Sequence, residues 1–174
     1  MIILGIDPGT ATTGFGILKK PKTNTEKMIT IDYGCIKTSP GEAAGERLKI
    51  LNRELNKLIK KHHPDIIAVE RLFFFKNLKT AMPVSEAKGV ILFTAAKNKI
   101  PVYEFTPLQV KMTVAGYGKA EKKQVQKMIR NLLDLEENPE DKDKKRDDAA
   151  DALGVALCYA IHSESEKRLK SCLS

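Results

Sequence analysis

The stretch IILGIDPGT, residues 2–10, joins an apolar run to a carboxylate and a Pro-Gly turn. A continuous apolar run of this kind predicts a β-strand that is covered on both faces. Asp7 ends the strand, and a carboxylate is costly to bury unless it has partners. It either hydrogen-bonds the backbone of its own turn or finds partners elsewhere in the chain. The stretch by itself leaves both alternatives open.

Four further stretches predict β-strands. TGFGIL (residues 13–18) and MITIDYGCI (28–36) follow the first strand, with PKTNTEK as the turn between them. Strands this close in sequence favour an antiparallel meander. DIIAVE (65–70) and PVYEF (101–105) predict the fourth and fifth strands, and DIIAVE again ends on a carboxylate, Glu70.

Helical periodicity begins after residue 41. Apolar side chains recur at intervals of three and four along residues 44–58, which predicts a helix that Pro64 ends. Residues 78–99 show a second helical pattern, with Pro83 in its first turn or at a kink. Thr106 followed by Pro107 is a typical N-cap and first position of a short helix.

The C-terminal third is predicted to be helical with one interruption. A glycine and lysine loop, residues 116–124, opens a helix with an expected apolar face of Val125, Met128, Leu132 and Leu133. The charged segment 136–145 has no period and predicts a mobile loop. Residues 147–161 predict a well-packed helix of small side chains, and residues 163–174 a frayed tail.

This order of elements predicts the α/β fold class: a five-stranded mixed β-sheet, its first three strands antiparallel, with helices on both faces. The chain of 174 residues contains no internal repeat and no long linker, and its length fits one core. We therefore expect a single domain over residues 1–162 and a flexible C-terminal tail over residues 163–174.

The composition favours an anionic partner. The formal net charge is +8 and the pI is near 9.3, which is typical of nucleic-acid-binding proteins, although Lys and Glu enrichment also marks proteins from hot environments. Three scattered cysteines, Cys35, Cys158 and Cys172, predict neither a disulfide framework nor a zinc site. No basic leader precedes the first apolar run, and no stretch reaches the roughly 18 apolar residues that span a bilayer. We expect a cytoplasmic protein with no membrane partner.

Carboxylates at the ends of apolar segments are candidates for a metal site. Ligands in α/β folds tend to bind beyond strand ends, where Asp7 and Glu70 lie. Asp148 and Asp151, or Asp147 and Asp151, would share one helix face, although acids at a helix N-terminus also act as caps. Clustered carboxylates without His or Cys select Mg²⁺ or Mn²⁺. Two such ions about 3.5 to 4 Å apart stabilise both the attacking and the leaving oxygen in phosphodiester hydrolysis.

Five motifs in this order resemble those of the RuvC crossover junction endodeoxyribonucleases, resolvases of four-way (Holliday) DNA junctions with a ribonuclease-H-like fold. The motifs are LGIDPGT with TGFG, AVE with an aromatic loop and KN, QVK, AEK with QVQ, and DAADALGVAL. They span the chain from Met1 to about His162. The resemblance implies paired symmetric nicks in recombination and DNA repair, which leave 5′-phosphate and 3′-hydroxyl ends.

The resemblance also implies which residues form the site. The metal-binding and catalytic acids would be Asp7, Glu70, Asp148 and Asp151, with two Mg²⁺ per site, Mn²⁺ as a substitute and Asp147 unused. Lys111 would act in catalysis beside them. Whether any of the acids is a general base stays open. The implied DNA contacts are Phe73, Phe74, Lys76, Lys111, Lys119, Lys122 and Lys123.

An aromatic side chain of this family stacks on an unpaired base, and Phe73 matches it, although core packing would explain one of Phe73 to Phe75 equally well. Symmetric cutting implies a homodimer, with the helix from Leu78 onward as its expected surface. The implied partners are four-way junction DNA and the branch-migration proteins RuvA and RuvB. The sequence also allows three alternatives: an actin-like or sugar-kinase-like ATPase, a non-catalytic junction-binding protein, and a ribonuclease-H-like RNA-processing nuclease.

Overall fold

A computed structural model describes residues 1–9, 11–23, 26–71, 78–135 and 144–172, with backbone alone at 78–80, 144–146 and 165–172. Its centre is one five-stranded sheet in the order β3-β2-β1-β4-β5. The predicted mixed sheet is confirmed, and each strand begins and ends within one residue of its expected bounds. The strands are β1 (Ile2–Asp7), β2 (Thr12–Lys19), β3 (Ile29–Lys37), β4 (Ile66–Glu70) and β5 (Val102–Phe105).

The pairing of the strands follows from the lengths of their connections. Short turns join β1, β2 and β3, which pair antiparallel, as a meander requires. Helical crossovers separate β4 and β5 from their neighbours, and the pairs β1–β4 and β4–β5 are parallel. The central strand β1 and its neighbour β4 therefore end at the same edge of the sheet.

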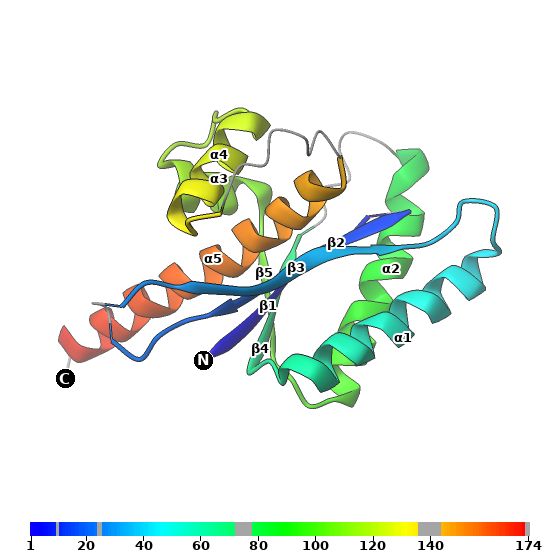
Figure 1. The fold of residues 1–174 in the computed structure, drawn as a ribbon, viewed down its shortest axis with the longest axis horizontal. Helices are drawn as coiled ribbons and strands as arrows, with labels where there is room; N and C mark the ends of the chain where they lie inside the picture. The colour runs from blue at the N-terminus through cyan, green and yellow to red at the C-terminus, as the bar shows by residue number, and fades with distance from the viewer. Residues whose placement is uncertain (10, 24–25, 72–77, 136–143, 173–174) are drawn as a thin grey trace.

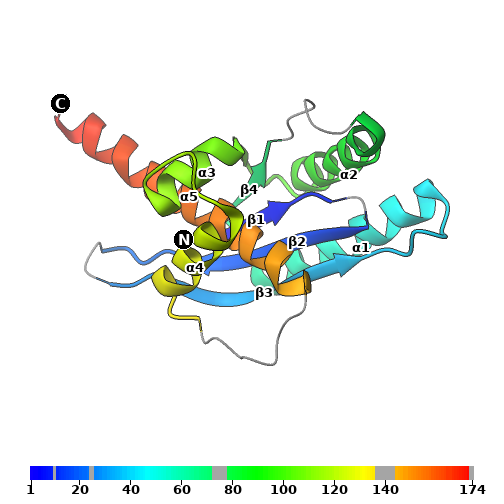
Figure 2. The ribbon, with the colours of Figure 1, turned by 90° about the horizontal axis from the view of Figure 1, so that it is seen from above.

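Helices cover both faces of the sheet (Figure 1). On one face, α1 (Ala44–His62) and α2 (Leu78–Lys97) bury leucine, isoleucine and alanine side chains against β1, β2 and β4. On the other face, α5 (Lys144–Cys172) lies across the strands, with α3 (Pro107–Ala115) and α4 (Lys122–Leu132) packed beside it (Figure 2). The three layers explain why β1 is apolar on both sides.

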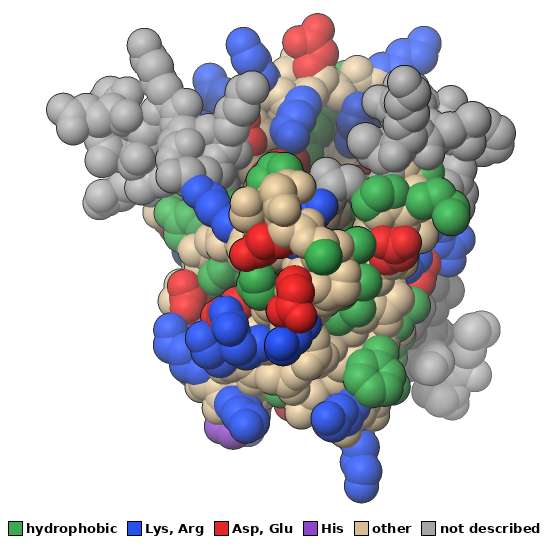
Figure 3. All heavy atoms as spheres, turned by 90° about the vertical axis from the view of Figure 1, so that its right-hand side faces the viewer, with side chains coloured by type: hydrophobic (Ala, Val, Ile, Leu, Met, Phe, Trp, Pro, Cys, Tyr) green, Lys and Arg blue, Asp and Glu red, His purple; other side chains and the backbone are tan. Residues whose placement is uncertain are grey.

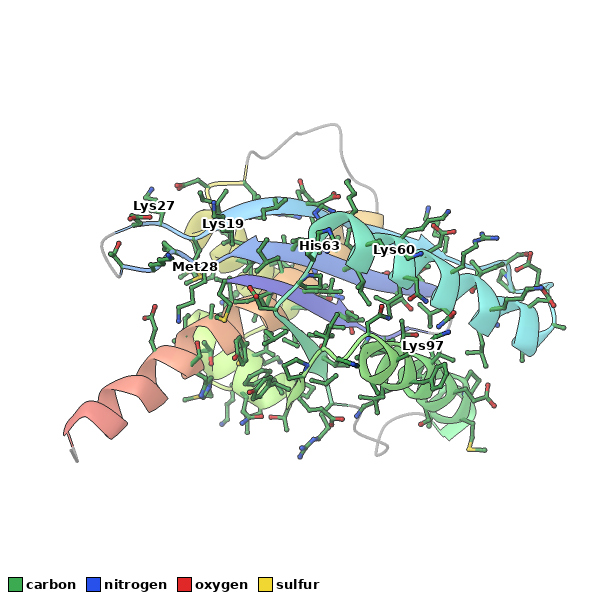
Figure 4. The ribbon with its side chains drawn as sticks, turned by 90° about the horizontal axis from the view of Figure 1, so that it is seen from below. Lys19, Lys27, Met28, Lys60, His63 and Lys97 are labelled. Atoms are coloured by element: carbon green, nitrogen blue, oxygen red, sulfur yellow. The ribbon has the colours of Figure 1, made fainter. Side chains whose placement is uncertain are left out.

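Local signals account for the ends of these helices. Thr106 and Gln109 form a capping box at α3, where Pro107 is the first helical residue, as the sequence predicts. His63 follows α1 in the left-handed conformation with φ of 47°. Lys60 and Lys97 lie in the last turns of α1 and α2 (Figure 4), where cations complement the helix dipole. Part of the basic surplus therefore has a structural explanation that needs no anionic partner.

Three expectations from the sequence differ from the structure. Residues 163–172, which the sequence predicts as a frayed tail, continue α5 as helix to Cys172. Pro83 lies inside α2 beyond its first turn. The α4 face is also shifted: Ile129 is buried, whereas Met128 and Leu132 are 39% and 46% exposed. In the described part of the chain, no helix has the length and apolarity that crossing a membrane requires.

Candidate active site

Two neighbouring strands bring the first pair of acids to one edge of the sheet. Asp7 is the last residue of β1, and Glu70 is the last residue of β4. The parallel register pairs Ile6 with Val69, so the two acids follow one residue later on adjacent strands. Asp7 and Glu70, far apart in sequence, thus reach the same site from apolar strands that fix their positions.

The first turns of α5 bring the second pair of acids over the same edge. Asp148 and Asp151 lie one turn apart, and both are half-buried. This close approach of α5 depends on glycines in the strands beneath it. A Cβ atom at Gly14 would fall on the backbone oxygen of Asp148, and one at Gly5 on that of Ala152. The glycines of β1 and β2 therefore allow the acid-bearing helix to lie directly on the sheet.

Three aspartates converge closely enough to share an ion. One carboxylate oxygen each from Asp7, Asp148 and Asp151 lies within 4.8 Å of the other two. Glu70 lines the same cleft, together with Lys111 of α3 and Lys122 of α4. The cleft offers about 390 Å³ of open space. Carboxylates from β1, β4 and α5 and amines from α3 and α4 thus meet in one cavity.

The proton affinities of these acids reflect first their burial and then the neighbouring carboxylates. Burial raises the pKa of Asp7 well above its usual range, and the carboxylates of Glu70, Asp151 and Asp148 raise it further. Burial and the Asp151 charge raise the pKa of Glu70 to about 7. Burial also raises the pKa of Asp148, although Lys122 opposes this shift. Without a bound cation, these acids therefore hold their protons to higher pH than exposed carboxylates do.

Asp151 has one donor on each carboxylate oxygen, and both come from α4. The Lys122 Nζ lies 2.7 Å from Oδ2, and the Gln126 Nε2 donates to Oδ1 at 3.2 Å. Burial lowers the pKa of Lys122, but the hydrogen bond and charge of Asp151 outweigh that effect and raise it. Lys122 thus serves as the local counterion of the acidic cluster.

The donor set fits a hard divalent cation. Oxygen ligands without His or Cys select Mg²⁺ or Mn²⁺, and the raised pKa values show that added positive charge would be favourable here. Such a site can hold and activate an oxygen nucleophile beside a phosphate. A lysine within the cleft can contact the same phosphate.

The other predicted site residues fall into two groups. Lys119 and Lys123 are exposed outside the lining of the cleft, whereas Phe73, Phe74 and Lys76 lie outside the described residues. Asp147 lies outside the aspartate cluster, with its Oδ1 3.9 Å from an Arg130 nitrogen. Among the described residues, Lys and Arg side chains are spread over the face shown in Figure 3 and are mixed with acidic ones, without forming a single basic block.

Gln126, the last residue of the QVQ motif at 124–126, contacts Asp151 but is not among the site residues that the sequence predicts. It stands next to Val125 and three residues before Ile129, on the buried face of α4. The available signal was a polar residue four positions after Lys122 on an otherwise apolar stripe. The predicted apolar face of α4 was placed toward Met128 and Leu132, so it did not include Gln126.

Comparisons with known proteins agree over nearly the whole chain. The family model described as "Crossover junction endodeoxyribonuclease RuvC" matches residues 3–159. Proteins of that name from Alkaliphilus metalliredigens and Pelotomaculum thermopropionicum are 53% and 47% identical. These matches cover 92% and 98% of this chain and 93% and 99% of the relatives.

The solved structure of Thermus thermophilus RuvC in complex with Holliday junction substrate superposes with a TM-score of 0.84. It is 34% identical in sequence, and the match covers 95% of this chain and 96% of that one. The yeast mitochondrial Holliday junction resolvase Ydc2, 21% identical with a TM-score of 0.64, shares the fold. The family model and the sequence identities of 47% and 53% over nearly the whole chain establish that this chain belongs to the RuvC family of crossover junction endodeoxyribonucleases.

Proposed function

We propose that this protein is a divalent-metal-dependent endonuclease that resolves four-way DNA junctions in recombination and repair by paired symmetric nicks. The convergence of Asp7, Asp148 and Asp151 carries the proposal, because an acidic cluster of this kind fits a phosphodiester hydrolase. The related RuvC structure from Thermus thermophilus, which is bound to a Holliday junction, supports the choice of substrate.

The four acids Asp7, Glu70, Asp148 and Asp151 would hold two Mg²⁺ ions, with Mn²⁺ as a substitute. Bound metal would supply a water of lowered pKa and neutralise charge on the phosphate. The strands and α5 fix the directions of the carboxylates. Hydrolysis at this site leaves 5′-phosphate and 3′-hydroxyl ends, as the family resemblance implies.

Two lysines in the cleft would contact the DNA backbone. Lys111 and Lys122 line the same cavity as Asp7 and Glu70, within reach of a phosphate that occupies it. A fixed cation at this position stabilises charge that develops on the phosphate in the transition state. Lys119 and Lys123 would add outer contacts that strengthen binding without reading sequence.

Two cuts in a pseudo-symmetric junction call for two sites, which a homodimer provides. The exposed side of α2 supports such a dimer, because Met82 and Phe93 are 71% and 63% exposed there. RuvA and RuvB would deliver the junction, and the cytoplasm would be the compartment, in keeping with DNA as substrate.

A cleavage assay tests the proposal. A mobile four-way junction, a linear duplex and an RNA duplex are each incubated with Mg²⁺ and with wild-type protein or Asp7→Asn. We expect the wild type to cut the junction with paired nicks and Asp7→Asn to bind but not cut it. Equal cutting of all three substrates, or cutting by Asp7→Asn, would overturn the assignment.

A further inference from the structure

Gln126 is a polar side chain in an apolar helix interface. It is 5% exposed on α4, and it adjoins Val125 on a face that packs against α5. A side-chain amide in such surroundings is costly to bury unless its hydrogen bonds are made. Its contacts therefore indicate what the residue does.

Both hydrogen bonds of the Gln126 amide nitrogen go to the acid-bearing turns of α5. One reaches Asp151 Oδ1 at 3.2 Å, and the other reaches the backbone oxygen of Asp147 at 3.4 Å. Asp147 directly precedes Asp148. A single side chain thus holds the carboxylate of Asp151 and the turn from which Asp148 projects.

Lys122 and Gln126 both contact the carboxylate of Asp151, but their side chains differ in how freely they can move. The side chain of Lys122 is 59% exposed, so its amine can turn toward solvent or a phosphate without disturbing the helix. Gln126 is enclosed between α4 and α5 and carries no charge, so it does not compete electrostatically with a cation. Lys122 is an exchangeable partner of Asp151, whereas Gln126 is a fixed one.

We propose that Gln126 is a positioning residue, which holds Asp151 and the first turn of α5 in the geometry that binds divalent metal. This inference rests on the proposed function, because it assigns a supporting residue to the same acidic site. Residues that orient metal ligands typically change metal affinity or activity by about 10- to 100-fold when they are removed. Gln126 has the burial and the contacts that such a role requires.

The test replaces Gln126 with Met, which keeps the side-chain length and removes the donor. The matched control is Thr94→Val, which removes a buried hydrogen bond to Asn52 between α1 and α2 and leaves the site untouched. A second variant, Gln126→Asn, keeps an amide that is one methylene too short to reach Asp151. For each protein, Mn²⁺ binding is measured by EPR without DNA, alongside thermal unfolding and junction cleavage.

We expect both Gln126 variants to bind Mn²⁺ about ten-fold or more weakly, while Thr94→Val binds it within two-fold of the wild type. If the Gln126 variants fold and bind Mn²⁺ as tightly as Thr94→Val, the inference is wrong although the proposed function stands. If the wild type neither binds Mn²⁺ nor cuts junctions, the proposed function fails, and the role of Gln126 fails with it.

Discussion

The amine of Lys122 lies 2.7 Å from Asp151 Oδ2, within the cleft that also contains Asp7 and Glu70. A lysine in this position neutralises one of the carboxylates that a metal ion would need. A bound metal ion would therefore compete with Lys122 for Asp151, and the released amine would be available to a phosphate of the substrate.

Lys122→Met should separate these two effects. Removal of the competing cation leaves Mn²⁺ affinity unchanged or raises it, whereas loss of the phosphate contact lowers the rate of junction cleavage by about ten-fold or more. EPR titration without DNA and single-turnover cleavage measure the two quantities. Lys127→Met, exposed on the same helix and outside the lining of the cleft, is the control and should change neither by more than about two-fold. A large loss of Mn²⁺ affinity in Lys122→Met would contradict this account.

Asp147 and Asp148 provide a matched pair of substitutions. Asp148→Asn should lower cleavage by more than about 100-fold, beyond the range for residues that only support metal ligands. Asp147→Asn should have little effect, because its carboxylate lies outside the cluster and faces Arg130 at 3.9 Å, and exposed ion pairs contribute about 0 to 1 kcal/mol. Cleavage rates at saturating Mg²⁺ compare the two. Equal losses in both variants would contradict the assignment of Asp148, rather than Asp147, to the site.

This choice between adjacent aspartates illustrates what sequence reasoning could and could not supply. The apolar runs predicted all five strands, because alternation and run length depend on local burial. The first of these runs ends on Asp7, which identified Asp7 as a carboxylate whose burial requires partners. Spacing alone left Asp147 and Asp148 equivalent, and only the family resemblance and the packing of α5 separated them.

Other features depended on contacts that sequence periodicity does not encode. The apolar face of α4 was shifted toward Met128 and Leu132, since apolar residues lie on both sides of this short helix. Gln126 was missed because its burial depends on α5, which lies 18 or more residues further along the chain. The helix α5 continues past residue 162, where the buried Lys20 amine donates to the Ala160 carbonyl and the Ser163 hydroxyl, contacts that join residues 140 or more positions apart.

The pKa of Glu70 makes the stability of the metal-free protein depend on pH. The pKa is raised from 4.5 to about 7, so between these values the folded protein holds a proton that the unfolded chain has released. The free energy of unfolding should therefore fall as the pH rises through this window. Carboxylates with lowered pKa values, such as Asp32 and Glu104, change the free energy of unfolding at pH values below this window.

Thermal unfolding in EDTA from pH 5 to 8 measures this effect, with Glu70→Gln as the comparison. We expect the variant to gain stability over the wild type as the pH rises, because it lacks the buried charge. Mg²⁺ should stabilise the wild type more at pH 8 than at pH 5, since metal binding requires deprotonated carboxylates. A stability difference between the two proteins that does not change with pH would rule out this role for Glu70.

Gly14 should be essential for the close packing of α5 on the sheet. A methyl group there would fall on the backbone oxygen of Asp148, so Gly14→Ala has to displace the helix from the sheet. We expect a loss of about 1 to 3 kcal/mol in stability together with weaker Mn²⁺ binding. Gly45→Ala is the control, because a methyl group there meets nothing within 4 Å and should stabilise α1 by up to about 1 kcal/mol. Unaltered Mn²⁺ binding in a folded Gly14→Ala protein would refute the link.

The exposed side of α2 provides the test of the proposed dimer. Met82 and Phe93 are largely exposed, and Gly89 between them leaves open space above the helix, a combination that allows a second helix to approach closely. Phe93→Lys should place a charge in this contact and halve the mass measured by sedimentation. Leu132→Lys, at a similarly exposed apolar site on α4, should leave the mass unchanged. Because Phe93 lies on the sheet face opposite α5, the Phe93→Lys monomer should keep its Mn²⁺ affinity and lose the pairing of nicks across a junction. If the Phe93→Lys protein remains dimeric, the dimer contact does not lie on this side of α2.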